Sequence, residues 1–89
     1  MSWFVYILEC SDKTYYTGIT TNLAERIIKH NSGKASKYTA SRLPVALVYS
    51  EEYSNRSQAS QAETSIKKMS REEKQQMIRR LRISGRHQR

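Results

Sequence analysis

Arg26 and His30 are the first residues whose types and spacing could serve chemistry. They lie four positions apart in a segment whose apolar residues recur with helical spacing. With Leu23 at 0°, a turn of about 100° per residue places Arg26 at about 300° and His30 at about 340°. A guanidinium and an imidazole there can bind a common anion. In the alternative interpretation, the aliphatic part of Arg26 covers the core and His30 lies at the boundary between the buried and exposed faces. The pattern of this helix, taken alone, favours that alternative. The residues expected to face the core are Leu23, Ala24, Ile27 and Ile28.

Glu63 is the second candidate, between Ala59 and Ile66 in another segment with helical spacing. Its carboxylate falls at the edge of the apolar face, although most glutamates on helices are solvated surface groups. Beside a basic cleft it could hold Mg²⁺, which prefers one or two carboxylates with water and substrate phosphate. One cysteine and two histidines exclude a structural zinc site, and three scattered glycines exclude a phosphate-binding loop.

The elements that must position these side chains form a small α/β domain. β-branched and aromatic residues predict strands at 3–9, 15–20 and 45–49, the first two joined by a turn. Residues 34–44 are polar, basic and without a period, which predicts a loop. The expected order is β-β-α-β-α-α, a three-stranded antiparallel sheet flanked by about three helices.

Three helices are predicted from caps and spacing. Asn22 begins the first and Gly33 ends it. The second follows Asn55, and Ser70 with Glu73 forms a capping box that opens the third. The third helix is expected to bury Met77, Ile78 and Leu81. We expect residues 1–84 to form one domain and residues 85–89 a frayed basic tail.

The net charge of +8 is concentrated at one end of the chain. Residues 67–89 carry nine Lys or Arg against Glu72 and Glu73, a net of +7, which leaves +1 for residues 1–66. This asymmetry favours nucleic acid as partner over an anionic membrane, the alternative being a solvated helix. A single cysteine, no secretory signal and no long apolar stretch predict a cytoplasmic protein without a membrane segment.

Two tyrosine motifs complete a family pattern. Phe4-Val5-Tyr6 and Tyr16-Thr17-Gly18, followed by Thr20, Arg26, His30 and Glu63, resemble the GIY-YIG nucleases, and most of all the short stand-alone members. Either tripeptide alone is weak, but the order and spacing of the whole set are specific. The likeness covers residues 3–69. It implies a three-stranded antiparallel sheet with helices, and cleavage of nucleic-acid phosphodiesters with one divalent metal, Mg²⁺ or Mn²⁺.

By this resemblance, Glu63 binds the metal and Arg26 stabilises charge on the phosphoryl group. Tyr6 takes a proton from the attacking water or orients it, with Tyr16 and His30 hydrogen-bonded around it. Fixed donors and a cation aimed at developing negative charge lower the barrier. A phenol serves as base only with a lowered pKa, which Arg26 and a metal would supply.

The chain departs from the family pattern at three places. Phe4-Val5 replaces Gly-Ile, and Thr17 replaces Ile. Many relatives carry an asparagine after the metal-binding glutamate, but residues 64–89 contain no asparagine. Lys67 or Lys68 would contact phosphate instead, as would Lys37, and Tyr38 resembles a position that assists the nucleophile. The remaining expected contacts with nucleic acid are Gly18 and Thr20.

The resulting hypothesis is a metal-dependent DNA endonuclease acting on branched or damaged DNA in repair or recombination. DNA is preferred over RNA, and strong specificity would need a protein partner or a particular nucleic-acid shape. The main alternative is a nucleic-acid-binding module with little or no catalysis, and a further one is a domain that docks an acidic protein.

The hairpin register is a separate prediction. An odd loop at residues 11–13 pairs Tyr6 with Gly18 and Leu8 with Tyr16, so both tyrosines share a face while Tyr15 lies opposite. Gly18 would leave space there for water and phosphate.

Overall fold

Three antiparallel strands form the centre of the molecule. The structure, a computed structural model, describes the backbone of residues 2–87 and the side chains of residues 2–81. The elements in chain order are β1 (Trp3–Glu9), β2 (Tyr15–Thr20), α1 (Leu23–Asn31), α2 (Lys37–Ala40), β3 (Ala46–Tyr53), α3 (Arg56–Lys67) and α4 (Arg71–His87). The sheet order is β2-β1-β3, which confirms the predicted antiparallel α/β fold.

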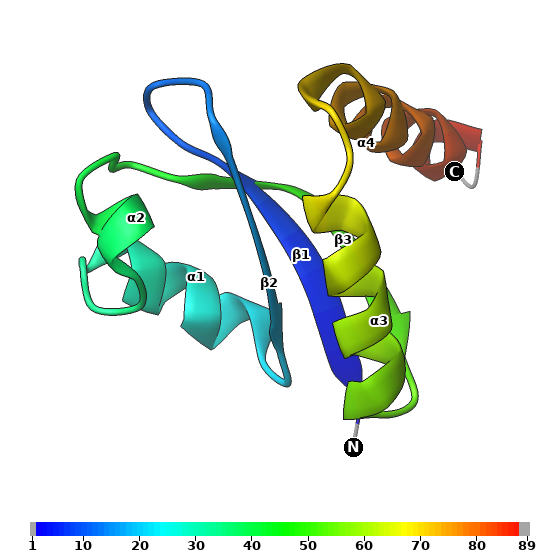
Figure 1. Ribbon diagram of the computed structural model, residues 1–89, viewed down its shortest axis with the longest axis horizontal. Coiled ribbons are helices and arrows are strands. Elements are labelled where there is room, and N and C mark those ends of the chain that lie inside the picture. The colour runs from blue at the N-terminus through cyan, green and yellow to red at the C-terminus, as the bar shows by residue number, and fades with distance from the viewer. Residues whose placement is uncertain (1, 88–89) are drawn as a thin grey trace.

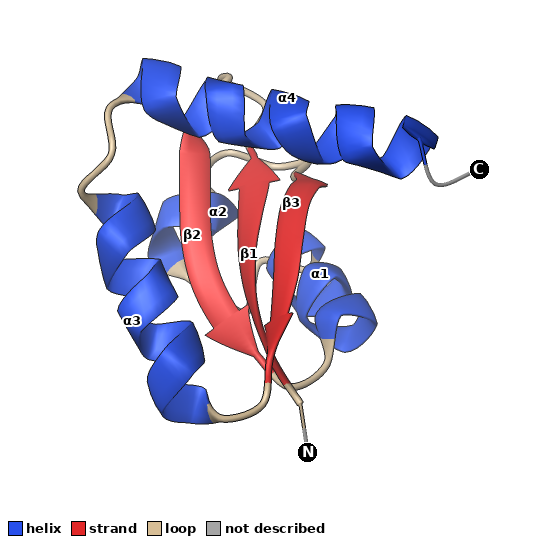
Figure 2. Cartoon of the chain, turned by 90° about the vertical axis from the view of Figure 1, so that its right-hand side faces the viewer, coloured by secondary structure: helices blue, strands red, loops and turns tan. Residues whose placement is uncertain are grey.

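The helices cover both faces of the sheet (Figures 1 and 2). α1 and α2 lie on one side, whereas α3 runs alongside β2 and α4 crosses one end of the sheet on the other side. Because β1 is the central strand, its side chains are buried alternately on the two faces. Val5 and Ile7 pack with residues of α3 and α4, and Tyr6 and Leu8 pack toward α1. Tyr6 therefore belongs to the face that α1 covers.

The hairpin has the predicted register. Tyr6 pairs with Gly18 and Leu8 pairs with Tyr16, so the two tyrosines lie on one face. Tyr15 packs against the cluster on the opposite face. The backbone N–H of Cys10 donates to the carbonyl of Thr14 at 2.8 Å, which closes a three-residue loop. Lys13 has a φ of 71°, as expected for the last residue of such a loop.

The caps of α1 and α4 form as the sequence predicts. The Asn22 side chain accepts a hydrogen bond from the Glu25 N–H, and Gly33 has a φ of 79° just after α1. The N–H groups of Gly33 and of residue 34 donate to the carbonyls of residues 30 and 29, a Schellman motif. At the start of α4, Ser70 and Glu73 satisfy each other's backbone N–H groups. These caps fix where each helix begins or ends.

The face of α1 was predicted wrongly. Ile28 is 70% exposed and Ala24 is also exposed, whereas His30 is 1% exposed. The buried stripe centres on Leu23, Ile27 and His30, a rotation of about 60° from the expected stripe. Polar partners for His30 in β1 and α2 explain why a histidine is buried in preference to an isoleucine.

Other element boundaries differ from expectation. Residues 34–44 contain the one-turn helix α2, because the Ser36 side chain caps it by accepting from the Thr39 N–H. β3 extends beyond residue 49 to Tyr53, which pairs with Trp3. At the far end, α4 continues to His87, where we expected a frayed tail, and residues 88–89 lie outside the described residues. Leu81, expected inside, is 40% exposed.

Candidate active site

The side chain of Tyr6 lies directly across Gly18 of the neighbouring strand. A Cβ atom at position 18 would come within 2.6 Å of the Tyr6 hydroxyl oxygen and 2.7 Å of its Cζ. Such distances are well inside van der Waals contact, so only glycine fits beside this phenol. The space that we expected for water and phosphate is therefore filled by Tyr6 itself, and Gly18 acts by admitting the ring.

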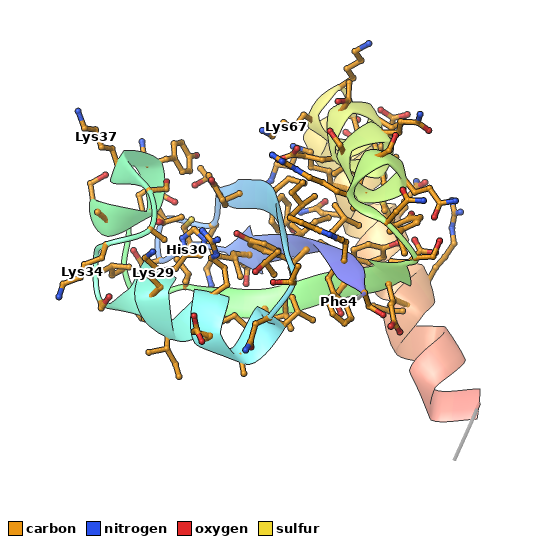
Figure 3. All side chains as sticks on the ribbon, turned by 90° about the horizontal axis from the view of Figure 1, so that it is seen from below. Phe4, Lys29, His30, Lys34, Lys37 and Lys67 are labelled. Carbon is orange, nitrogen blue, oxygen red and sulfur yellow. The ribbon has the colours of Figure 1, made fainter. Side chains whose placement is uncertain are left out.

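Tyr6 ends in a buried hydrogen-bond chain that joins β1, α1 and α2. Its hydroxyl lies 2.9 Å from Nε2 of His30, and Nδ1 of His30 lies 2.8 Å from the Thr39 hydroxyl. The Thr39 hydroxyl also lies 3.3 Å from the Ser36 carbonyl, to which it can only donate. Tyr6, His30 and Thr39 are 2%, 1% and 0% exposed, so these three hydrogen-bonded side chains lie almost entirely inside the protein. Figure 3 shows His30 pointing inward from α1 toward the strands.

Burial dominates the protonation of this pair. It raises the pKa of Tyr6 to about 12; the next largest effects are an increase from Tyr16, a decrease from Arg26 and, last, an increase from Glu63. Arg26 lowers the pKa of Tyr6, as expected, but burial outweighs this effect, and the expected contribution of a metal stays a prediction. Burial and the nearby Arg26 charge lower the pKa of His30. At neutral pH the pair is therefore a neutral phenol against a neutral imidazole.

Tyr16 closes one side of the site. Its ring meets the His30 ring edge to face, with centroids 5.1 Å apart and an angle of 62°. On its other side it stacks on Tyr38, with centroids 6.1 Å apart. The Arg42 guanidinium lies 3.9 Å from the Tyr38 ring centroid and pairs with Asp12 at 3.0 Å. The aromatic wall is thus tied to the hairpin loop.

Glu63 and Arg26 direct their charges at the same phenol from two helices. Both change the pKa of Tyr6 through space, in opposite directions, which places a carboxylate of α3 and a guanidinium of α1 within electrostatic range of its oxygen. The Glu63 side chain is 22% exposed, so it is not the fully solvated group of the alternative reading. Its Oε2 lies 3.3 Å from the Lys67 ammonium. Tyr6, Tyr16 and His30 therefore meet on the α1 side of the sheet, with Arg26 on the same helix as His30, while Glu63 belongs to α3 alongside β2 and acts on Tyr6 through its charge.

The donor set suits a hard divalent cation that shares its ligands with a substrate. Among the described residues, no three His, Cys, Asp or Glu side chains gather into a metal cluster. Glu63 provides a single carboxylate that is partly exposed and already pairs with a cation. Mg²⁺ typically binds to proteins through only one or two carboxylates, and water and phosphate oxygens complete its ligand shell. Glu63 could supply such a single carboxylate.

Comparison with known proteins identifies the family of this chain. A family model described as the GIY-YIG catalytic domain matches residues 2–76. The chain belongs to the GIY-YIG family. This finding confirms the resemblance drawn from the two tyrosine motifs and places the protein in a family of nucleases.

Relatives of this GIY-YIG protein are short. The UPF0213 protein DP2720 of Desulfotalea psychrophila is 53% identical, over 86% of this chain and 71% of the relative. The UPF0213 protein SH2523 of Staphylococcus haemolyticus is 51% identical, over 84% and 92%. Solution NMR structures of EF2693 from E. faecalis and of the UPF0213 protein BH0048 from Bacillus halodurans share the fold. Their TM-scores are 0.64 and 0.57, at 37% and 44% identity, with coverage of 93% and 88% of this chain and 88% and 83% of theirs.

The residues predicted to contact nucleic acid fall into two groups in this GIY-YIG domain. Gly18 and Thr20 are buried, and the Thr20 hydroxyl accepts from the Asn22 N–H at 3.1 Å. Both residues therefore shape the site and are not exposed for contact with nucleic acid. Lys37, Lys67 and Lys68 are exposed and Tyr38 is 38% exposed, so these four remain available to a ligand. Figure 3 shows Lys37 pointing into solvent and Lys67 on the part of α3 nearest α2.

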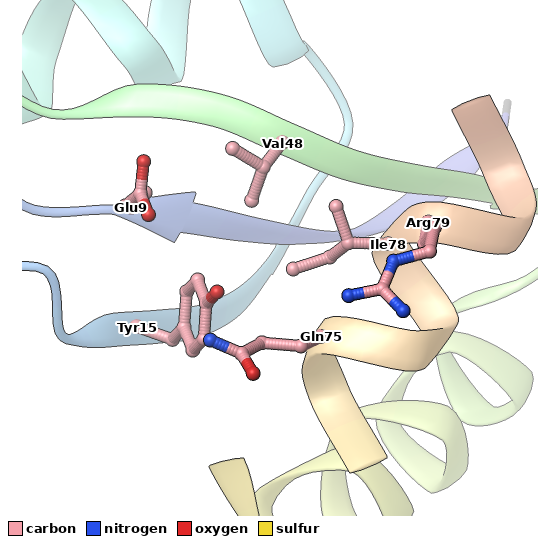
Figure 4. A pocket seen from close by; sticks show the side chains of 6 residues that line it. All are labelled: Glu9, Tyr15, Val48, Gln75, Ile78 and Arg79. Atoms are coloured by element: carbon pink, nitrogen blue, oxygen red, sulfur yellow. The ribbon is translucent and has the colours of Figure 1, made fainter. Parts of the chain in front are cut away.

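A groove leads from the site along the edge of β2. It has a volume of about 260 Å³ and is lined by Tyr15, Tyr16, Thr17, Tyr38, Lys67 and Lys74. A slightly larger hollow of about 280 Å³ lies between the sheet and α4, lined by Glu9, Tyr15, Val48, Gln75, Ile78 and Arg79 (Figure 4). The three hydrogen-bonded side chains Tyr6, His30 and Thr39 do not line this larger hollow. We therefore associate the first groove, which shares Tyr16 and Lys67 with the site, with the chemistry.

Thr39 is the site residue that sequence reasoning missed. Its hydroxyl is the partner of His30 Nδ1, yet it lies in a polar segment predicted to be a loop. Ser36, three residues earlier, is a typical capping residue and was the available signal for a short helix.

None of the described helices is long and apolar enough to cross a membrane.

Proposed function

We propose that this protein is a metal-dependent endonuclease that hydrolyses phosphodiester bonds in DNA, with branched or damaged DNA as the preferred substrate in repair or recombination. The observation that carries the proposal is the buried Tyr6–His30 hydrogen bond of 2.9 Å beside opposite charges from Arg26 and Glu63. A buried, hydrogen-bonded tyrosine on a strand needs no charged neighbours for stability. Membership in a nuclease family supports a phosphodiester substrate.

Tyr6 and His30 share the work of removing a proton from water. Since the pKa of Tyr6 is about 12, forming a free phenolate near pH 7 costs about 7 kcal/mol, at about 1.4 kcal/mol per pH unit. No free phenolate is needed if the Tyr6 proton moves to Nε2 of His30 while the Tyr6 oxygen takes a proton from the attacking water. The phenol then stays neutral and the imidazole becomes an imidazolium.

The remaining groups act on the phosphoryl centre. The water oxygen forms a bond to phosphorus as the bond to the leaving oxygen breaks, and that oxygen takes a proton from solvent. Arg26 stabilises the negative charge that gathers on the phosphoryl oxygens. Glu63 would hold the Mg²⁺ or Mn²⁺ ion, one per site, which when bound supplies Lewis-acid stabilisation of that charge. His30 returns its proton through Tyr6.

The test is cleavage of plasmid and branched DNA in Mg²⁺ or Mn²⁺ by three proteins: wild type, Glu63→Gln and Glu72→Gln. Glu72 is an exposed glutamate of α4 and controls for the loss of one negative charge. We expect wild type and Glu72→Gln to cleave equally, and Glu63→Gln or added EDTA to abolish cleavage. Absence of wild-type cleavage with both metals, or equal cleavage by Glu63→Gln, would disprove the proposal. Parallel RNA substrates test the preference for DNA.

One observation favours a second candidate, a nucleic-acid-binding module without turnover. The Lys67 ammonium already neutralises the carboxylate that would bind the metal, at 3.3 Å. On this alternative, Lys67 and its neighbours bind phosphates and Glu63 only orients Lys67. Binding with a steep salt dependence and no product, unchanged in Glu63→Gln, would support it.

A further inference from the structure

We propose that Thr39 is a positioning residue: its hydroxyl holds His30 in the tautomer that carries the proton on Nδ1, which leaves Nε2 free to take the proton of Tyr6. For its effect on rate, this inference rests on the proposed nuclease activity. The tautomer itself can be measured without any turnover.

Counting protons along the chain decides its direction. If Tyr6 donates to Nε2, Nδ1–H donates to Thr39 and Thr39 donates to the Ser36 carbonyl, then all three protons have acceptors. In the reverse direction, Thr39 donates to Nδ1 and Nε2–H donates to Tyr6. The Tyr6 proton then has no acceptor among the described residues, and the Ser36 carbonyl keeps only its bond from the Ala40 N–H. Buried polar hydrogens are rarely left unpaired, so the first direction is favoured.

Of the other groups around His30, only Tyr6 hydrogen-bonds to the ring, and its hydroxyl can donate or accept. Tyr16 presents its ring to the imidazole edge to face, and Tyr6 occupies Nε2. Arg26 acts on the ring through its positive charge, and Glu63 is coupled to Tyr6. Thr39 is the one hydrogen-bond partner of Nδ1 among the described side chains.

The construction of α2 supports this role. α2 comprises four residues, of which Thr39 is completely buried while Lys37, Tyr38 and Ala40 are exposed. The Ser36 side chain caps the turn, and the Ser36 carbonyl receives the Thr39 proton. With that proton engaged, the Thr39 oxygen faces Nδ1 as an acceptor. A purely structural threonine would also attach α2 to α1, so the test must separate the two roles.

The decisive experiment is ¹⁵N NMR of the His30 imidazole in wild type, Thr39→Val and Thr39→Ser, with Thr64→Val as control. Valine keeps the shape of threonine without its hydroxyl, serine keeps the hydroxyl, and Thr64 is an exposed threonine of α3. We expect protonated Nδ1 and unprotonated Nε2 in wild type, Thr39→Ser and Thr64→Val. In Thr39→Val the preference for Nδ1–H should be lost. Nε2–H in wild type overturns the proposal whatever the variants do, and so does an unchanged tautomer in folded Thr39→Val.

Cleavage kinetics then measure the consequence. Thr39→Val should lower kcat about 10-fold or more and change KM by less than about twofold, because a hydrogen bond to the far nitrogen orients a working imidazole. Thr39→Ser should restore most of the rate. Equal kcat in wild type and Thr39→Val would refute the positioning role. If wild type does not cleave at all, the proposed function fails, while the NMR result still decides the tautomer.

Discussion

Replacing Gly18 by alanine tests whether Tyr6 needs the space of a missing side chain. The new Cβ would lie 2.6 Å from the Tyr6 hydroxyl oxygen and 2.7 Å from Cζ. Tyr6 is 2% exposed and hydrogen-bonded to His30, so its ring is buried and held at its hydroxyl end. Either β2 moves away from β1, or the phenol moves and its hydrogen bond to His30 breaks.

The expected loss of stability follows from these contacts. Overpacking a buried site costs about 1–3 kcal/mol. Separating the Tyr6–His30 pair leaves buried polar groups unpaired, at about 1–3 kcal/mol. Alanine restricts the unfolded chain more than glycine, which returns about 0.4–1 kcal/mol. We therefore expect Gly18→Ala to lower the free energy of unfolding by about 2–4 kcal/mol, or about 8–30 °C in Tm.

Urea unfolding of wild type, Gly18→Ala and Gly33→Ala measures this loss. Gly33 has open space around its Cα but a φ of 79°, so alanine there costs about 1–2 kcal/mol through backbone conformation alone. Cleavage should fall with Gly18→Ala and stay intact with Gly33→Ala. A change below about 0.5 kcal/mol for Gly18→Ala would refute the reasoning, since it would mean that the ring does not need this space.

Three further changes have definite expected outcomes. Thr17→Val should raise the free energy of unfolding by about 1 kcal/mol in urea titrations, because the Thr17 hydroxyl is buried without a partner among the described residues; a destabilised variant would contradict this. Lys67→Gln should reduce the slope of log binding constant against log salt by about 1 on DNA, and cost at most about 0.5 kcal/mol of stability, since the pair with Glu63 is on the surface; an unchanged slope would exclude a phosphate contact. Since the pKa of His30 is lowered on folding, the unfolded state binds more protons below about pH 6.5, and the free energy of unfolding should fall from pH 7.5 to 5. His30→Gln should show a shallower decrease, and equal slopes would argue against a buried neutral imidazole.

The hairpin and the helix caps were predictable because they depend on short, local patterns. An odd loop at residues 11–13 sets the register, and the register alone places Tyr6 and Tyr16 on one face. Asn22 and Ser70 carry their capping partners within three residues. Such interactions need no knowledge of the rest of the fold.

The interior of the site was not predictable in the same way. Hydrophobicity favours burial of Ile28 over His30, and only partners from β1 and α2 reverse this order. The raised pKa of Tyr6 depends on burial, which a strand pattern does not quantify. Thr39 lies in a segment too short and polar for a periodic signal. By contrast, the ion pair of Glu63 with Lys67, four residues on, follows from helical spacing and was overlooked.

The central claim is that Tyr6 and Glu63 belong to one hydrolytic site, and single-turnover cleavage by four proteins tests it most directly. These are wild type, Tyr6→Phe, Glu63→Gln and the double variant, on branched DNA in Mg²⁺. Residues that act as a unit are not additive, so we predict that the double variant is no slower than the slower single variant. Multiplied losses in the double variant would contradict one shared site, and wild type without cleavage would contradict the function itself.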